Sequence, residues 1–398
     1  MNPIFPALNP EEQTLYACLA LQHKVGYAGF TRLMEVLRSP AAVYAASAEQ
    51  LKTIHPRMTD ETVESIQKGP NRTSWEKIAE QCDKLRVKID APGSHDYPAP
   101  LLQLNAPPPL LFIQGSWQPQ DAIAVAIVGT RQPTDYGRKA AFTLANDLSR
   151  ARVTVVSGFA VGIDAEAHAG TLDANGRTLA VIGCGADIPY PLENQHLRER
   201  IVQNGAIISE FPPGASPRRD HFPRRNRILS GLAKAIVVVE AGKRSGALLT
   251  AAHARTQGKT LFAMPGSVFS SASSGTHTLL KRDAKLAVSA EDILPALEDK
   301  PAPAQPERIT SSSTTLSTTP TVGLSIAGNE PVLELWRDEK ICGLDRLIAR
   351  SLELNLWPAG NTLANLMQSL LRLELRGLVQ RLPGPTFRKI IPRLPFQA

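Results

Sequence analysis

The segment 220–234, DHFPRRNRILSGLAK, places three arginines where an apolar helix is expected to begin. A helix N-terminus already carries partial positive charge, so cations are unfavourable there unless an anion lies beside them. The spacing therefore predicts an anion site of phosphate size at the entrance of this helix. Its candidate residues are Arg224, Arg225, Asn226 and Arg227.

The same segment concentrates the positive charge of the chain. The formal net charge is +7, and residues 213–234 carry six basic side chains against the single Asp220. A basic patch favours a polyanionic partner, with an ordinary solvated face as the alternative. Phe222, which precedes the arginines, is a candidate for stacking on a base, or else it anchors the helix in the core.

Continuous apolar, β-branched runs alternate with helical patterns through the middle of the chain. This alternation predicts an α/β fold in which a parallel sheet is covered on both faces. Ligands of such sheets bind beyond the carboxyl ends of the strands, so the loops that follow the strands are the place to look. The runs lie at 123–128, 153–157, 178–183, 206–209, 235–241 and 260–266.

Those loops contain small residues and cations. Small residues leave backbone N–H groups open, and helix N-termini attract phosphate. Each glycine alone is equally explained by a tight turn, but their combination along one sheet edge predicts a nucleic-acid-binding rim. Its further candidates are Arg131, Ser157, Gly158, Gly162, Lys243, Ser245, Gly246 and Thr250.

Enzymatic interpretations have less support. The chain has no GxGxxG or GxSxG motif, and its histidines and separated cysteines lack metal-ligand spacing. Asp164 and His168 lie near Ser157 and raise the hypothesis of a catalytic triad, although a structural helix pair is commoner. We expect a binding protein without catalytic residues, metal or cofactor. The alternative is a nucleotide or phosphoribosyl hydrolase that uses Asp164, His168 or Glu240.

Composition divides the chain into four parts. Residues 1–90 show helical periodicity, and residues 299–330 belong to a Ser/Thr/Pro-rich stretch that predicts a disordered linker. The last part has three helical patterns followed by two short extended pieces, which predicts a winged-helix domain. The expected order is a helical domain (1–90), an α/β domain with its lead-in (91–298), the linker (299–330) and the winged helix (331–398).

Gly26 and Gly29 are expected between two N-terminal helices. This arrangement is either a SAM/helix-hairpin-helix-like element that offers N–H groups to phosphate, or a plain packing turn, which the neutral charge of the region favours. The chain shows no signal-peptide pattern and no apolar run long enough for a membrane span. Four scattered cysteines favour a reducing cytoplasm.

A set of motifs in fixed order resembles one known family. They are IVGTR…YG, VVSGFAVGIDAEAH, GCGADIPYP, ISEFPPG, HFPRRNRILSGL, VVVEAGKRSGALLTAAHA and FAMPGS…SGTHTLL, between about 123 and 290. Together they resemble DNA-processing protein A, the DprA or Smf family. The resemblance implies a Rossmann-like domain flanked by helical and winged-helix domains.

The resemblance also implies a function and partners. Members are non-catalytic, single-stranded-DNA-binding proteins that protect incoming DNA and load the RecA recombinase during natural transformation. They are typically homodimers paired through the C-terminal part of the Rossmann-like domain, here within about 247–285, including residues 277–280. Two departures from the family pattern are Asp283, where glycine is usual, and the extra segment 353–361, ELNLWPAGN.

Overall fold

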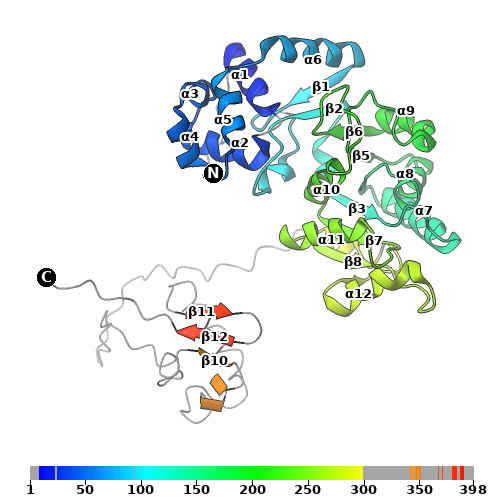
Figure 1. Ribbon diagram of the computed structural model, residues 1–398. Coiled ribbons are helices and arrows are strands. Elements are labelled where there is room, and N and C mark those ends of the chain that lie inside the picture. Colours follow the sequence, from blue (N-terminus) through cyan, green and yellow to red (C-terminus); the bar gives the residue numbers. More distant parts are fainter. Residues whose placement is uncertain are drawn as a thin grey trace, which may run out of the picture. The chain divides into compact units, whose positions relative to one another are not determined.

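The computed structural model describes residues 9–22, 25–94 and 96–298, with short stretches between 341 and 389 (Figure 1). The chain divides into two compact units, residues 1–307 and 308–398. The predicted linker 299–330 and the segment 353–361 lie outside the described residues.

The first unit is built on a nine-stranded sheet with the order β1-β2-β6-β5-β4-β3-β7-β8-β9. Strands β3 to β9 pair in parallel, which confirms the six expected strands. The strands are β1 (Val87–Asp90), β2 (Leu111–Gly115), β3 (Ala124–Val128), β4 (Thr154–Ser157), β5 (Thr178–Ile182), β6 (Gly205–Ser209), β7 (Ala235–Val238), β8 (Thr260–Ala263) and β9 (Lys285–Leu286).

The sheet is not parallel throughout, and this corrects the prediction. Strand β2 runs antiparallel to β6, and β1 runs antiparallel to β2. Both strands lie outside the expected alternation: β1 falls within the range predicted for the helical region, and β2 falls in the Pro-rich lead-in. The lead-in therefore extends the sheet at one edge.

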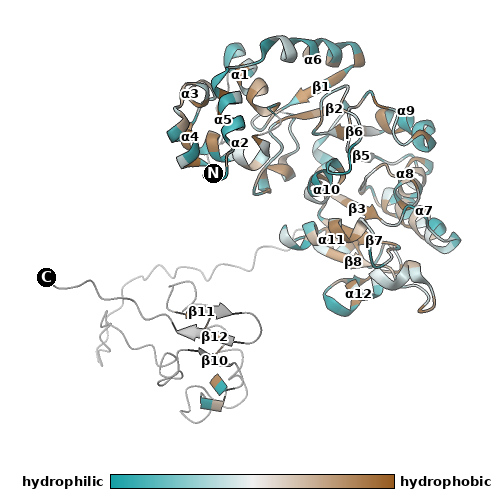
Figure 2. Cartoon of the chain, viewed as in Figure 1, coloured by the Kyte–Doolittle hydropathy of each residue, from teal (hydrophilic) through white to brown (hydrophobic). Residues whose placement is uncertain are grey.

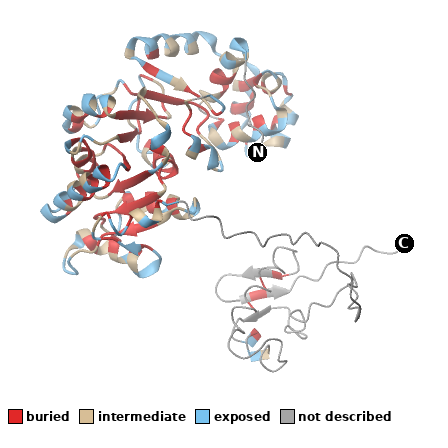
Figure 3. Cartoon of the chain, turned by 180° about the vertical axis from the view of Figure 1, so that it is seen from behind, coloured by how far each residue is buried: buried red, intermediate tan, exposed pale blue. Residues whose placement is uncertain are grey.

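Helices cover both faces of the sheet, because the central strands are apolar on both sides (Figure 2). One core joins the strands to α10, α11 and α12, and the other joins them to α7, α8 and residues 287–297. The strands are buried between these layers (Figure 3). The helices are α7 (Asp135–Arg150), α8 (Ile163–Asp173), α9 (Gln195–Gln203), α10 (His221–Leu232), α11 (Ala247–Thr256) and α12 (Ser274–Arg282).

Six N-terminal helices share a core with the β1–β2 edge of the sheet, through Leu110 and Phe112. Gly26 and Gly29 both belong to α2, so the prediction that they lie between two helices is wrong. Gly29 is buried, and a Cβ there would lie 3.6 Å from the His55 ring, as expected of helix packing. The helices are α1 (Pro10–Ala20), α2 (Gly26–Leu37), α3 (Pro40–Ala45), α4 (Ala48–Ile54), α5 (Asp60–Gln67) and α6 (Arg72–Leu85).

The second unit contains a three-stranded antiparallel sheet with the order β10-β12-β11. Its strands are β10 (Ile341–Gly343), β11 (Val379–Leu382) and β12 (Thr386–Lys389). The last two are the extended pieces that the sequence predicted on either side of 383–385. The winged-helix and SAM/helix-hairpin-helix classes stay predictions. Within the described residues, no helix is long and apolar enough to cross a membrane.

Candidate nucleic-acid interface

A groove of about 630 Å³ lies beyond the carboxyl ends of the parallel strands, where the expected parallel α/β topology predicted a site. Its walls come from the β3–α7 loop, the β4–α8 loop, the first turns of α10 and the β7–α11 loop. Strands β4, β3 and β7 are adjacent in the sheet, so loops that are distant in sequence meet at one edge. The groove brings together seven predicted residues, and the predicted Lys243 is not among its lining residues. The seven are Arg131, Phe222, Arg225, Asn226, Ser245, Gly246 and Thr250.

The groove is strongly cationic. Among its described lining residues, Arg131, Arg219, Arg225 and Arg244 are basic, and Asp164 is the acidic one. Arg131, Arg219 and Arg244 are exposed, whereas Arg225 is buried. Three guanidinium groups are therefore available to an anion in the groove, each able to hold phosphate through paired N–H donors.

Helix N-termini add to this positive potential. The cap residues of α8, α10 and α11 make no side-chain hydrogen bond to the helix, whereas Thr134 caps α7. The first backbone N–H groups of an α-helix have no partner within the helix, so an uncapped N-terminus favours an anion. The N-terminus of α11 lies at the groove, where Gly246 and Ala247 are lining residues. The groove thus combines exposed cations with the backbone dipole of a helix N-terminus.

Arg225 acts from beneath the groove. Its side chain is 5% exposed, and its Nη1 donates to the carbonyl oxygen of Val181. Asp164 lies beside it: burial raises the pKa of Asp164, and the charge of Arg225 opposes that rise. A Cβ on Gly158 would lie 2.1 Å from Arg225 Nη1 and 2.6 Å from Asp164 Oδ2. Gly158 therefore makes room for a buried pair that supports the groove floor.

The other two arginines of the segment point away from the groove. Arg227 pairs with Glu210, donates to the carbonyl oxygen of Ala106 at 2.9 Å, and lies 4.1 Å from the centroid of the Tyr27 ring. Arg224 lies 3.8 Å from Glu210 and 5.2 Å from the centroid of Phe211. The prediction that all three arginines need an external anion is wrong for Arg227, because Glu210 supplies its negative charge, whereas Arg224 lies farther from Glu210 and is partly exposed.

The remaining predicted residues shape the loops. The Ser157 hydroxyl is buried and donates to the carbonyl oxygen of Ile127 at 2.7 Å. Gly162 has φ +87°, and a Cβ there would lie 2.5 Å from the carbonyl oxygen of Thr130. Ser157 therefore ties the end of β4 to β3, and Gly162 allows its loop to approach the backbone of the β3–α7 loop closely.

The triad hypothesis is wrong in geometry. The Ser157 hydroxyl donates to the backbone carbonyl of Ile127, whereas His168 Nδ1 lies 2.7 Å from the Thr178 hydroxyl. The two side chains therefore have different hydrogen-bond partners, and neither is the partner of the other. Burial lowers the pKa of His168 to about 3, so the ring is neutral and poorly suited to accept a proton. Glu240 accepts from the backbone N–H of Thr134 at 2.9 Å and from its hydroxyl at 2.6 Å.

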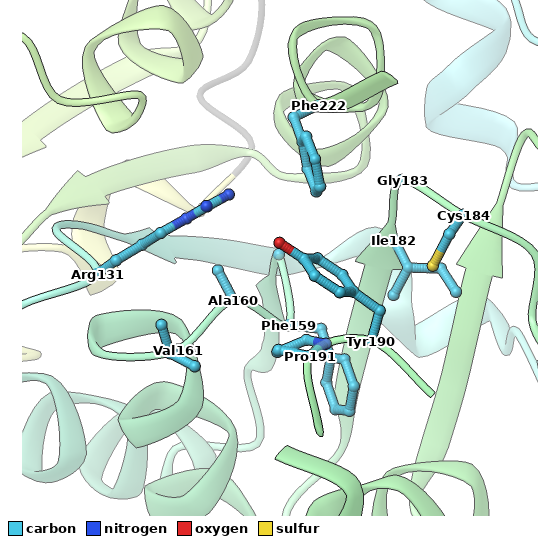
Figure 4. Close-up of a pocket in the computed structure, with 11 residues that line it drawn as sticks. Arg131, Phe159, Ala160, Val161, Ile182, Gly183, Cys184, Tyr190, Pro191 and Phe222 are labelled. Carbon is cyan, nitrogen blue, oxygen red and sulfur yellow. The ribbon is translucent and has the colours of Figure 1, made fainter. Parts of the chain in front are cut away.

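An aromatic pocket adjoins the groove and shares Arg131 and Phe222 with it (Figure 4). The Tyr190 and Phe222 rings lie 5.9 Å apart at an interplanar angle of 47°, and the Arg131 guanidinium lies 5.3 Å from the Phe222 centroid. Phe222 is partly exposed and lines both the pocket and the groove.

Sequence reasoning missed two residues, Tyr190 and Arg219. Tyr190 belongs to the GCGADIPYP loop, which was noted without a candidate residue, and Arg219 was counted only within the basic patch. The aromatic type of Tyr190 and its place after a strand could have identified it. In the described part of the chain, no cluster of His, Cys, Asp and Glu side chains is arranged to hold a metal ion.

A mostly parallel α/β sheet with a cationic groove at its strand ends places the chain in the class of α/β proteins whose strand-end loops are suited to an anion. Within that class, the sequence profile of the DNA recombination-mediator protein A family matches residues 88–298. The chain therefore belongs to this family.

Individual relatives agree. Protein Smf of Synechocystis is 33% identical over 343 residues, which cover 82% of this chain and 86% of that protein. A putative DNA processing protein DprA of Mycobacterium tuberculosis is 51% identical over 171 residues, 43% of this chain and 44% of that protein. The X-ray structure of DNA processing protein A from Streptococcus pneumoniae matches with 30% identity and a TM-score of 0.52, and the match covers 71% of this chain and 92% of that one.

Proposed function

We propose that this chain binds single-stranded DNA in the groove and acts in DNA processing without catalysing a reaction. The observation that carries the proposal is the meeting of exposed Arg131, Arg219 and Arg244 with the N-terminus of α11 in one groove. Guanidinium groups and uncapped helix N-termini bind the phosphates of DNA whatever its base sequence. A protein that handles DNA of any sequence requires contacts of this kind.

The aromatic pocket favours single strands over duplexes. The Phe222 and Tyr190 rings lie beside the groove, so a base of a strand in the groove can turn toward them. Stacking on a side chain requires an unpaired base, because a base in a duplex is already stacked and paired. Stacking in the pocket thus contributes to the affinity for single-stranded DNA and not to the affinity for duplex DNA.

The wider role rests on the family resemblance. We propose that the chain protects incoming single strands and loads RecA onto them during natural transformation, in the cytoplasm. Cys18, Cys82 and Cys184 are free and buried, as suits a reducing compartment. Strand exchange by RecA on DNA covered with single-strand-binding protein tests this step: the chain should shorten the lag, and an unchanged lag would refute loading.

We also propose a homodimer paired through about 247–285. Apolar side chains are exposed at and just beyond this range: Val268 is 78% exposed, Phe269 is 97% exposed and Leu286 is 54% exposed. Strand β9 forms the edge of the sheet, and Asp283, the departure from the family pattern, accepts a hydrogen bond from Arg255 Nε at 2.9 Å beside it. A partner covering this edge would remove apolar surface from water.

The hydrolase alternative is less well supported. The groups it needs are engaged elsewhere: Asp164 with Arg225, His168 with Thr178, and Glu240 with Thr134. Hydrolysis of a nucleoside monophosphate that Asp164→Ala abolishes would restore this alternative.

Binding of oligo(dT) and of duplex DNA across a salt series tests the proposed function. We expect tighter binding of the single strand, and a logarithmic affinity that falls with log salt by about 0.7 for each phosphate contacted. Absence of measurable oligonucleotide binding at low salt would overturn the proposal.

A further inference from the structure

A second pocket, of about 310 Å³, lies against a different side of α10 from the groove. The N-terminal helices contribute Tyr27 to it, and the segment after β6 contributes Glu210 and Phe211. The segment leading into α10 and its first turns contribute Arg218, His221 and Arg224. None of these residues contributes to the groove, so the two depressions are separate on the surface.

The start of α10 lies between the two depressions. Arg218 lines the second pocket, and its neighbour Arg219 lines the groove. The same alternation holds for the consecutive pair His221 and Phe222, and for Arg224 and Arg225. One short stretch of chain therefore presents cationic and ring side chains to both sides. A flexible polyanion in the groove can reach the second pocket by crossing this stretch.

The second pocket combines a largely apolar lining with two buried polar side chains and two more accessible cations. The Glu210 side chain is 5% exposed, and its Oε2 has no hydrogen-bond partner, although Arg224 lies 3.8 Å away. His221 is 2% exposed; its Nδ1 lies 3.0 Å from the carbonyl oxygen of Gly183, and its Nε2 has no partner. Arg224 and Arg218 are more accessible, with side chains 32% and 61% exposed. Buried polar atoms are nearly always hydrogen-bonded, so two unpartnered atoms in one pocket point to a ligand.

The arrangement restricts the chemistry of that ligand. A bare phosphate is disfavoured in the depth of the pocket, because the Glu210 carboxylate repels it. A nucleotide carries its anion at one end and a planar base with N–H donors at the other, so it can satisfy Arg224 and Glu210 together. A carboxylate accepts well from the exocyclic amino group of cytosine.

We propose that the second pocket takes one nucleotide of the single strand that lies in the groove, with its phosphate at Arg218 and Arg224 and its base toward Glu210. This inference rests on the proposed function, and it extends the path of the strand over α10. The groove alone serves a short oligomer, whereas a longer one occupies both depressions and makes an additional phosphate contact.

Salt-dependent binding of oligo(dC) of two lengths to the full chain tests the inference. We would use oligomers of about five and about fifteen nucleotides, a range that single-strand sites span. Arg224→Ala should lower the magnitude of the salt slope by about 0.7 for the long oligomer and leave that of the short one unchanged. Arg200→Ala is the matched control, since it removes the same charge from the exposed surface of α9.

The outcomes separate this inference from the proposed function. An equal loss for both lengths would place Arg224 in the groove, and no loss for either would leave the second pocket unused; both results overturn the inference. If wild-type protein binds neither oligomer, the proposed function itself fails. Should Arg224→Ala fold poorly, Arg218→Ala gives the same test with a more exposed side chain.

Discussion

Neighbouring arginines in one short motif have different roles. Arg225 is buried beside Asp164 under the groove, Arg227 is buried against Glu210 and Tyr27, and Arg224 faces the second pocket. Their sequence suggested a single cluster of cations. Because side chains leave a helix in different directions, three residues within one turn meet three different environments. At the residue scale, charge alone therefore does not identify a DNA contact.

Arg227→Ala should destabilise the fold. It would leave the buried Glu210 carboxylate without its closest cation, and breaking a buried ion pair in this way costs about 3–5 kcal/mol. The urea midpoint of unfolding measures the effect, with Arg200→Ala as an exposed control that should leave the midpoint nearly unchanged. A normal midpoint combined with weakened DNA binding would show instead that Arg227 contacts the nucleic acid.

His168 should make stability depend on pH. Its pKa in the folded protein is about 3, below the 6.5 of the free side chain, because burial disfavours the charged ring. Between these values the unfolded chain binds a proton that the folded chain does not, so stability is full above about pH 6.5 and falls by about 1.4 kcal/mol per unit toward pH 3.

Urea unfolding at a series of pH values between about 7 and 5 measures this dependence. The variant His168→Gln lacks the titrating group, so its stability should fall less steeply with pH than that of the wild type. Parallel pH profiles for the two proteins would contradict the assignment of a buried, neutral His168.

At the scale of elements, the groove exists because loops after β3, β4 and β7 share one sheet edge. The glycines in these loops are not equivalent. Gly158 and Gly162 leave no room for a Cβ, whereas a Cβ on Gly246 would meet nothing within 4 Å. The first two are needed for the loop conformation, and the third is compatible with a side chain.

Gly162→Ala and Gly246→Ala form a matched pair. The first should lower stability by roughly 1–3 kcal/mol, since it combines φ +87° with a contact to the Thr130 carbonyl oxygen. The second should leave the thermal midpoint unchanged. Thermal unfolding of both variants measures the difference, and equal midpoints would refute the steric explanation.

The sequence was sufficient for the central strands and for the edge where the groove lies, because both follow from continuous apolar runs and parallel topology. It was not sufficient for β1 and β2, whose short antiparallel pairing is masked by the surrounding Pro-rich composition. The orientation of the Arg227 side chain also could not be predicted from the sequence. Its partners Glu210 and Tyr27 are remote in sequence, so only the tertiary fold brings them together.

At the scale of the whole molecule, the proposed homodimer can be tested by its exposed apolar edge. Leu286→Glu should convert a dimer into a monomer, because it places a charge on the edge strand that a partner would cover. Light scattering after size-exclusion chromatography measures the mass. Val36→Glu is the control: Val36 is also 54% exposed but lies on α2, outside the proposed interface. Loss of the dimer in both variants, or in neither, would count against this interface.

The cationic groove is the central claim, and the triple variant of Arg131, Arg219 and Arg244 to alanine tests it most directly. All three side chains are exposed, so the variant should keep the thermal midpoint of the wild type. Titration of oligo(dT) across a salt series should show a slope smaller in magnitude by about 2, from three lost phosphate contacts of about 0.7 each, and a much lower affinity at low salt. A folded triple variant with the affinity and the salt slope of the wild type would contradict the account.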